Sequence, residues 1–270
     1  MPKCSVLITT YNAEKFIEYT LQSILWQTFS DIEILILDNK SQDGTIQSMK
    51  QIIGSDKRFS IVESKKNLGP YKWLKLLIDK AQWEYIAILD HDDLWHPDKL
   101  SEQIKILDQN TQYVWCWSTF VDVREGKNFC KNELVTLANV VLHSSLVFRN
   151  KWYKYNDKIT RHNDRDFMVN ILAQDGDIFK INKALVLRRM RNNWENISVR
   201  HASFGSLLKV KEKSWVHWYE YIYNIVRFRY FMLYRIFLFV FFPLKIGTLS
   251  TFLKKPLRKD HADFVSQTFK

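Results

Sequence analysis

Glycine is scarce in this chain of 270 residues: there are only seven, and the closest two, Gly44 and Gly54, are ten positions apart. A dinucleotide-binding fingerprint needs glycines two and three positions apart, and a phosphate-binding loop needs two glycines five positions apart. The sequence therefore excludes both loops. If the protein binds a nucleotide, it does so by other means.

Cysteine is also rare. The three cysteines, Cys4, Cys116 and Cys130, are odd in number, widely spaced and form no CxxC pair. This spacing argues against a structural zinc site and against a disulfide framework, and a reducing cytosol fits it best.

The chain lacks an apolar run long enough to cross a membrane. Its most apolar block, residues 236–244, is nine residues long, and reading back to Tyr230 gives fifteen residues with Arg235 inside. A spanning helix needs about 20 apolar residues. We therefore expect no membrane-spanning helix here.

Positive charge is concentrated near the C-terminus. The net charge of the whole chain is +11, and residues 207–259 alone carry eleven basic and two acidic residues, a net charge of +9. The same region is aromatic, since 13 of the 28 residues from Trp215 to Phe242 are Trp, Tyr or Phe. Such interleaving suits nucleic acid or a membrane surface, and we expect helices that lie on an anionic membrane surface. The alternative is that these aromatic side chains pack against the main domain or a second subunit.

Short apolar segments alternate with helical patterns through the first 100 residues. Uniformly apolar strands alternating with helices predict an α/β fold with a mostly parallel sheet covered on both faces. Polar residues follow the strands at their carboxyl ends, where open α/β sheets bind ligands. The sequence is less regular from 101 to 205. The expected strands are 5–10, 32–37, 59–62, 85–89 and 144–148, and the expected helices are 13–27, one after the turn at 41–45, 71–81 and one that begins near Asp98.

Three carboxylates crowd the turn after the strand at 85–89, in the sequence Asp90-His91-Asp92-Asp93. Like charges so close together destabilise one another unless a cation is present. Oxygen ligands of this kind suit Mg²⁺ or Mn²⁺ bound together with substrate phosphates. The alternative is a solvated turn whose aspartates cap the helix that follows.

Taken together, an ordered set of motifs over residues 4–198 resembles the family 2 glycosyltransferases. These are inverting enzymes of the GT-A fold that use nucleotide sugars. The resemblance lies in SVLITTYN at 5–12, LQSILWQTF at 21–29, LDNKSQDGT at 37–45, NLG at 67–69, EYIAILDHDDLWHPDKL at 84–100, HSSLVFR at 143–149, NDRDF at 163–167 and RNNWENIS at 191–198.

The resemblance assigns donor-binding roles to residues at the ends of the first two strands. Tyr11 offers a flat face for stacking a base, and Thr9 offers a hydroxyl beside it. Asp38 would accept hydrogen bonds from the base or ribose. Where the family often has a second aspartate, this chain has Asn39, which can both donate and accept. A UDP- or dTDP-linked sugar is the expected donor.

The carboxylate turn takes the metal-binding role in this resemblance. Asp90 would face the ribose and the metal, and Asp92 would ligate Mn²⁺ or Mg²⁺ directly. Asp93 is expected to support the loop. The cation would neutralise the diphosphate as it leaves.

The resemblance places the catalytic base at Asp164, with Asp166 as the alternative in the same loop. An N-terminal cap of the following helix is the competing use of either carboxylate. Arg191 and Asn193 fall in the segment that family members can use near the diphosphate or metal, with Asn193 in place of the usual His. His143 is expected on the acceptor side, and a buried structural histidine is the alternative.

The sequence thus predicts one GT-A domain with a nucleotide-sugar half at 1–100 and an acceptor half at 101–206, followed by an aromatic and basic helical extension at 207–270. The expected function is metal-dependent transfer of one sugar to a growing, lipid-linked surface glycan, on the inner face of the cytoplasmic membrane. Nucleic acid is not an expected partner of this enzyme, and self-association is left open. The alternative is a non-enzymatic basic protein that binds membrane or nucleic acid on a GT-A-like scaffold.

Overall fold

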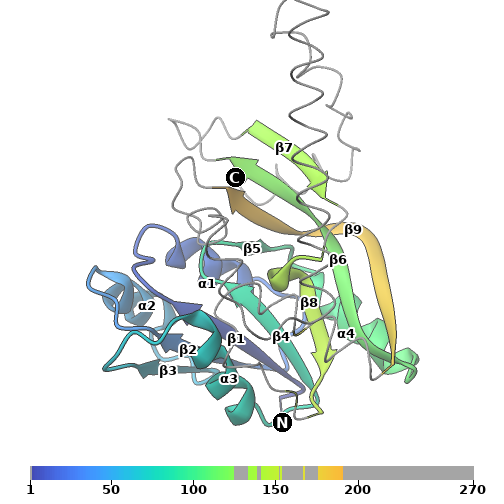
Figure 1. Cartoon of the computed structure of the whole chain (residues 1–270), viewed down its shortest axis with the longest axis horizontal. Coiled ribbons are helices and arrows are strands. Elements are labelled where there is room, and N and C mark those ends of the chain that lie inside the picture. The colour runs from blue at the N-terminus through green and yellow to red at the C-terminus, as the bar shows by residue number, and fades with distance from the viewer. Residues whose placement is uncertain are drawn as a thin grey trace, which may run out of the picture. The chain divides into compact units, whose positions relative to one another are not determined.

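The computed structural model describes residues 2–124, 133–138, 141–151, 153, 167 and 176–190, all of which belong to one compact unit of the chain (Figure 1). Its elements are, in order, β1 (Cys4–Thr10), α1 (Ile17–Leu25), β2 (Ile32–Asp38), α2 (Thr45–Ile53), β3 (Phe59–Glu63), α3 (Pro70–Lys80), β4 (Tyr85–Asp90), β5 (Leu94–Trp95), α4 (Lys99–Gln109), β6 (Tyr113–Arg124), β7 (Glu133–Ala138), the 3₁₀ turn η1 (His143–Ser145), β8 (Leu146–Arg149) and β9 (Asp177–Met190).

The described strands form one mixed sheet of nine strands in the order β3-β2-β1-β4-β8-β6-β9-β5, and β7 pairs with β6 beside this path. The first four strands of this order are parallel to one another. The remainder is largely antiparallel, and the parallel pair β6–β9 is the exception. The predicted α/β fold is thus confirmed, and its parallel part is the half encoded by the first 90 residues.

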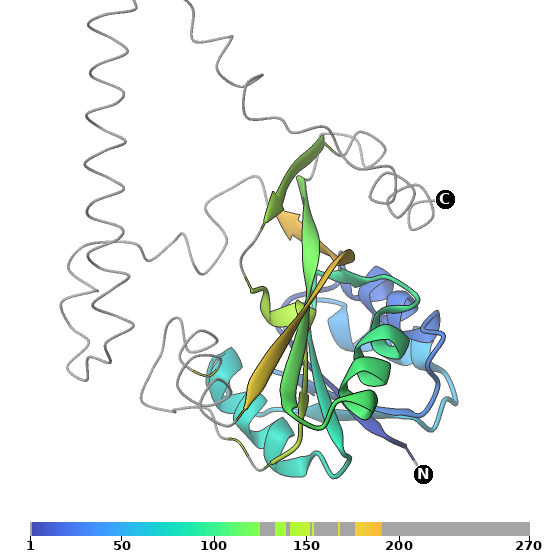
Figure 2. The same cartoon turned by 90° about the vertical axis from the view of Figure 1, so that its right-hand side faces the viewer.

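Apolar side chains cover both faces of the parallel strands because each face is packed against helices. Alternate residues of β1 point to opposite sides: Ile8 belongs to the core under α1, α2 and α4, and Leu7 belongs to the core under α3. Figure 2 shows the sheet nearly edge-on, with α3 in cyan and α4 in green on opposite sides. This double burial explains why the strands read as continuous apolar runs.

The predicted elements of the first 110 residues all occur, with shifted ends. The helix expected over 13–27 begins only at Ile17, because the Ala13 carbonyl accepts the N–H groups of Phe16 and Ile17 in a preceding turn. The strand expected over 144–148 begins at Leu146, since η1 occupies the preceding residues.

The two longest strands, β6 and β9, were not predicted. They pair over their whole length, and basic residues of β9 cover aromatic rings of β6. The ammonium of Lys180 lies 5.2 Å from the Trp117 ring centroid, and the guanidinium of Arg188 lies 4.8 Å from that of Phe120. The basic residues that cover aromatic rings in this way interrupt the apolar pattern of β9, by which a strand is recognised in a sequence.

In the described part of the chain, no helix is both long and apolar enough to cross a bilayer. The predicted membrane-associating segment at 207–270 lies outside the described residues, and so does Cys130. The division of the domain into halves at residue 100 stays a prediction.

A lysine side chain lies in the core, beside apolar and aromatic residues. Lys99, the first residue of α4, is fully buried, and its Nζ atom has no hydrogen-bond partner among the described residues. The ammonium lies 4.1 Å from the centroid of the Trp95 ring. Burial lowers the pKa of Lys99 to about 7, although the neighbouring thiols of Cys4 and Cys116 act in the opposite direction. Protonating Lys99 therefore costs the folded state free energy.

We expect Lys99→Met to stabilise the protein most at low pH. The pKa of Lys99 is about 7 in the folded state, below the value of about 10.4 expected when unfolded. Between these values the unfolded chain binds the extra proton, so wild-type stability rises with pH, by at most about 1.4 kcal/mol per pH unit. The stability advantage of Lys99→Met over the wild type should therefore shrink as the pH rises between these two values. Urea unfolding at several pH values measures the difference, with the exposed Lys105→Met as control. A difference that does not change with pH would contradict the burial of a titrating lysine.

Candidate active site

Three strands end together at one edge of the sheet. In the parallel register, Thr10 of β1 lies beside Asp38 of β2, and Thr9 lies beside Asp90 of β4. The predicted donor-side residues Thr9, Asp38 and Asp90 are therefore brought together by strand pairing alone. This carboxyl edge is the usual ligand-binding edge of an open α/β sheet.

The loops after β1 and β2 hold each other in place. The backbone N–H of Asn12 donates to Ser41 Oγ (2.9 Å), and Asn12 Oδ1 accepts from the backbone N–H of Gln42 (2.9 Å). Both loops contain a non-glycine residue at positive φ, namely Asn12 at 48° and Lys40 at 64°. Such conformations persist where surrounding contacts fix them. Tyr11, the predicted base-stacking residue, lies in the first of these two loops, with 42% of its surface exposed.

Asp38 is almost fully buried at the end of β2. Its Oδ1 accepts hydrogen bonds from the hydroxyls of Thr10 (2.9 Å) and Ser41 (2.5 Å), and its Oδ2 accepts from the backbone N–H of Ser41 (2.8 Å). A carboxylate can accept about four hydrogen bonds, so this carboxylate organises the edge and keeps about one further position.

Asn39 connects the end of β2 to the segment before α3. Its Nδ2 donates to Asn67 Oδ1 (2.8 Å), and its Oδ1 accepts from the backbone N–H of Leu68 (3.0 Å) and from Trp73 Nε1 (2.5 Å). An aspartate could accept the last two hydrogen bonds but could not donate the first. The amide therefore makes a contact here that the aspartate usual in the resembled family cannot make.

Asp90 opens the carboxylate turn, which we define as Asp90–Asp93. Its side chain is 42% exposed, and its Oδ1 lies 3.4 Å from Nδ1 of His143 in η1. Desolvation would raise the pKa of the Asp90 carboxyl, but the hydrogen bond and charge of His143 outweigh it, so the pKa is lowered. The structure thus places His143, predicted near the acceptor or diphosphate, against Asp90.

Asp93 closes the turn and is buried. Its Oδ2 lies 2.6 Å from Ser144 Oγ, and its Oδ1 accepts the backbone N–H of Arg189 (3.1 Å). The Ser144 hydroxyl also accepts the backbone N–H of Asp90 (3.1 Å), so one side chain holds both ends of the turn. Burial and the neighbouring carboxylates of Asp92 and Asp90 raise the pKa of Asp93 well above its usual value. These contacts agree with the expectation that Asp93 supports the loop.

Two further residues hold the turn through backbone atoms. The hydroxyl of Thr20 in α1 lies within hydrogen-bonding distance of the carbonyls of His91 (2.9 Å) and Asp93 (3.1 Å). Arg189 Nε donates to the Asp92 carbonyl (3.3 Å), and its guanidinium lies 4.8 Å from the ring centroid of Phe16. A cationic side chain therefore lies against the most acidic segment of the sheet edge.

The turn fits a divalent cation that is bound together with a diphosphate. Among the described residues, no group of three or more His, Cys, Asp or Glu side chains is arranged to hold a metal ion. Mg²⁺ and Mn²⁺, however, are commonly bound through one or two carboxylates plus substrate phosphates. Asp90, with its lowered pKa, and Asp92, two residues later, are carboxylates of the required kind.

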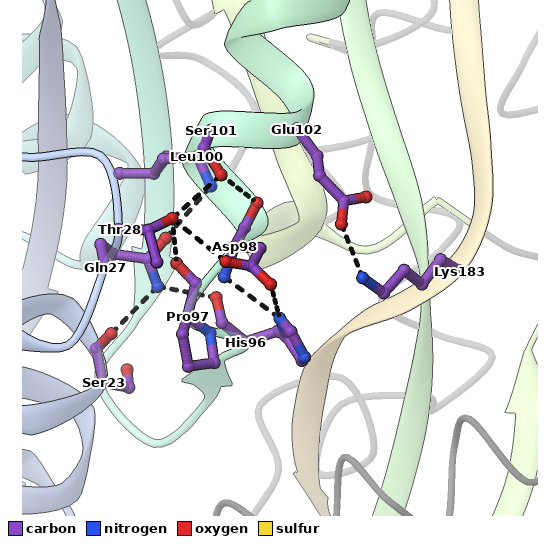
Figure 3. Close-up of polar contacts among 10 residues, drawn as sticks. All are labelled: Ser23, Gln27, Thr28, His96, Pro97, Asp98, Leu100, Ser101, Glu102 and Lys183. Atoms are coloured by element: carbon purple, nitrogen blue, oxygen red, sulfur yellow. Dashed lines mark hydrogen bonds and ion pairs between the residues drawn. The ribbon is translucent and has the colours of Figure 1, made fainter.

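The segment after β5 is fastened to the end of α1 (Figure 3). Gln27 Nε2 donates to the His96 carbonyl (2.8 Å), and Gln27 Oε1 accepts the backbone N–H of Leu100 (3.1 Å). The backbone N–H of Thr28 donates to the Pro97 carbonyl (2.9 Å). These contacts hold the end of α1 against the start of α4, and they thereby fix the segment that follows the carboxylate turn.

Further side-chain contacts hold the start of α4 to its neighbours (Figure 3). The Thr28 hydroxyl contacts Asp98 Oδ1 (3.2 Å) and Ser101 Oγ (3.1 Å), and Lys183 of β9 forms an ion pair with Glu102 of α4 (2.6 Å). None of these residues was predicted to be functional, and their contacts are structural.

Four predicted site residues, Asp164, Asp166, Arg191 and Asn193, lie outside the described residues. Three residues that hold the carboxylate turn were missed: Thr20, Ser144 and Arg189. Ser144 lies in the HSSLVFR motif, so a short polar motif before a strand was the available signal. No sequence signal pointed to Thr20 or Arg189, because neither lies in a polar motif: Thr20 lies within a helix and Arg189 within a strand.

Comparison with known proteins places the chain in a family. The model of glycosyl transferase family 2 matches residues 5–205. An uncharacterized glycosyltransferase of Methanocaldococcus jannaschii is 28% identical over 211 residues, covering 71% of this chain and 72% of the relative. TuaG, a putative teichuronic acid biosynthesis glycosyltransferase of Bacillus subtilis, is 36% identical over 106 residues, covering 39% of this chain and 42% of the relative.

Solved structures show the same fold. TarS of S. aureus (residues 1–349), in complex with UDP-GlcNAc, superposes with a TM-score of 0.60 at 22% identity, covering 71% of this chain and 59% of that one. The mannosyltransferase PcManGT of Pyrobaculum calidifontis, in complex with GDP-Man and Mn²⁺, superposes with a TM-score of 0.55 at 17% identity, covering 69% and 56%. The described fold is thus the GT-A fold. Since the family match extends over most of the chain, the protein belongs to glycosyl transferase family 2.

Proposed function

We propose that the protein transfers one sugar, with inversion, from a UDP- or dTDP-linked donor to a hydroxyl of a growing, lipid-linked surface glycan. The observation that carries the proposal is the meeting of three polar strand ends, at Thr10, Asp38 and Asp90, beside the carboxylate turn. Membership of family 2 supports glycosyl transfer as the reaction type. TuaG is named for teichuronic acid biosynthesis, which supports a surface polysaccharide as the acceptor class.

The donor would lie across the ends of β1 and β2. Tyr11 is exposed enough to stack on a base, and Thr9 lies next to Asp90 in the register. The remaining acceptor position of Asp38 suits an N–H of the base or a ribose hydroxyl. Asn39 would act on the donor site mainly by holding residues 67–69 in place.

Asp92, with Asp90, would hold Mn²⁺ or Mg²⁺ against the donor diphosphate. The Mn²⁺ present with GDP-Man in PcManGT supports a divalent cation. The cation would act as a Lewis acid that neutralises charge on the departing diphosphate. His143 would keep Asp90 ionised, since the contact between them lowers the pKa of Asp90.

Transfer also requires a base, for which we propose Asp164, with Asp166 as the alternative. The base takes the proton of the acceptor hydroxyl while its oxygen attacks the anomeric carbon. The bond from that carbon to the diphosphate oxygen breaks, and the nucleoside diphosphate leaves from the opposite face. Arg191 and Asn193 are proposed to lie near the diphosphate.

Residues 207–259 would bring the enzyme to its acceptor. Their net charge of +9 and their aromatic content suit the anionic inner face of the cytoplasmic membrane. A lipid-linked acceptor would be concentrated at the same surface, which favours encounter.

Asp92→Asn tests the metal assignment. The substitution removes a ligand charge at a partly exposed position, so we expect the fold to survive and turnover to fall by at least about 10²-fold, the scale for loss of a major electrostatic stabiliser. Asp79→Asn, on the exposed side of α3, is the matched control. Wild-type turnover in the Asp92 variant, or turnover that EDTA leaves unchanged, would exclude the assignment.

Asp164→Asn tests the base. Because an amide cannot take the acceptor proton, transfer should be lost while donor affinity, measured by calorimetry, stays near that of the wild type. Asp166→Asn is the paired variant. If Asp166→Asn abolishes transfer and Asp164→Asn does not, the base is Asp166.

Vesicle co-sedimentation tests the membrane surface. The full chain should pellet with anionic vesicles at low salt, stay in solution with neutral vesicles, and be released as salt rises, because each basic residue near the surface contributes about 1 kcal/mol. A chain lacking residues 207–270 should not pellet. If the intact chain stays in solution with anionic vesicles at low salt, the aromatic segment packs on protein instead.

A further inference from the structure

A chain of buried contacts links the core to the carboxylate turn. Trp95, the last residue of β5, is 1% exposed, and its Nε1–H donates to the Ser144 carbonyl (2.8 Å). The hydroxyl of the same Ser144 accepts the Asp90 N–H and contacts the Asp93 carboxyl. On the Trp95 ring lies the buried ammonium of Lys99, 4.1 Å from the ring centroid. Every interaction from Lys99 to Asp90 is therefore direct; the contacts from Trp95 to Ser144 and from Ser144 to Asp93 are buried, and the last one, to the Asp90 N–H, is partly buried.

Stability does not account for Lys99. A buried cation without a hydrogen-bond partner costs free energy, and an apolar side chain of the same length would fill the space. The ring of Trp95 is the aromatic face within reach of the ammonium, and such a contact is strongest where water is excluded. The ammonium also polarises the indole, so that its N–H becomes a better donor to Ser144.

Ser144 is where the effect would reach the active site. It lies in η1 between His143, which contacts Asp90, and Ser145. A displacement of Ser144 would therefore alter three contacts of the turn: the Asp90 N–H, the Asp93 carboxyl and the His143 ring.

We propose that Lys99 and Trp95 act through Ser144 as positioning residues for the carboxylate turn, so that the core sets the geometry at which Asp90 and Asp92 meet the donor. Neither Lys99 nor Trp95 is proposed to touch substrate. The positioning of the turn is a property of the fold itself, and its effect on turnover rests on the proposed function.

The first test reads the turn directly, by hydrogen exchange of the full-length protein, in a peptide that spans the turn. Lys99→Met keeps a long unbranched side chain and removes the charge, and Trp95→Phe keeps an aromatic ring and removes the indole N–H. Each should speed exchange in the turn by about tenfold, the factor that corresponds to the loss of roughly 1.4 kcal/mol of contact free energy. Ser118→Ala is the control, since it also removes a buried polar atom that has no hydrogen-bond partner in the part of the chain that the structure describes. Exchange in the turn that matches this control in both variants would overturn the proposal, whatever reaction the protein catalyses.

The second test measures turnover of the best donor, with Mn²⁺, in the same variants. Lys99→Met and Ser144→Ala should each lower turnover, and the double variant should be no worse than Ser144→Ala alone, because both act through one residue. Effects that multiply would show that Lys99 acts by another route. If Ser144→Ala fails to fold, Trp95→Phe takes its place. The double variant with Lys99→Met and Trp95→Phe should then have a turnover no lower than that of Trp95→Phe alone.

The pH profile separates positioning from simple packing. Trp95 from β5, Cys4 from β1 and Cys116 from β6 face the ammonium, and burial raises the pKa of both thiols to about 12, so they stay neutral. The ratio of wild-type turnover to that of Lys99→Met should therefore fall toward one as the pH rises from about 6 to 9, because Lys99 loses its proton. A ratio that is constant across this range would reduce Lys99 to a packing residue and overturn its positioning role.

Discussion

The site depends on the register of β1 between its two parallel neighbours. Pairing places Thr10 beside Asp38 and Thr9 beside Asp90, so the polar ends of three strands meet at one edge. A slip of one residue would move each end by about 3.3 Å and turn its side chain to the other face of the sheet. The braced loops at Asn12 and Ser41, and the fastening of Gln27 and Thr28 to the segment after β5, all build on this alignment.

The three carboxylates of the turn differ because their surroundings differ. Asp93 is buried, carries a raised pKa and is held by Ser144 and Arg189. Asp90 is partly exposed and kept ionised by His143. Asp92 lies between them, and Arg189 holds its carbonyl. The fold thus uses one carboxylate as structure and, on our proposal, presents the other two to the cation and donor.

The sequence was sufficient to predict the parallel strands, because double burial makes each of them a continuous apolar run that ends in polar residues. It could not predict what holds the turn, since Ser144 and Arg189 are 54 and 96 residues away from their partners Asp90 and Asp93. Those contacts arise only when β8 and β9 take their places in the sheet. The burial of Lys99 could not be predicted either, because a lysine at the start of a helix normally lies in solvent.

On our proposal, this edge of the sheet binds a nucleotide sugar together with a divalent cation. Release of nucleoside diphosphate from a panel of UDP- and dTDP-sugars, with Mn²⁺ and with EDTA, tests it most directly. We expect release from at least one donor with Mn²⁺, and we expect EDTA to abolish this release. Absence of release from every donor in the presence of Mn²⁺ and membrane extract would contradict it and favour a basic binding protein on this scaffold.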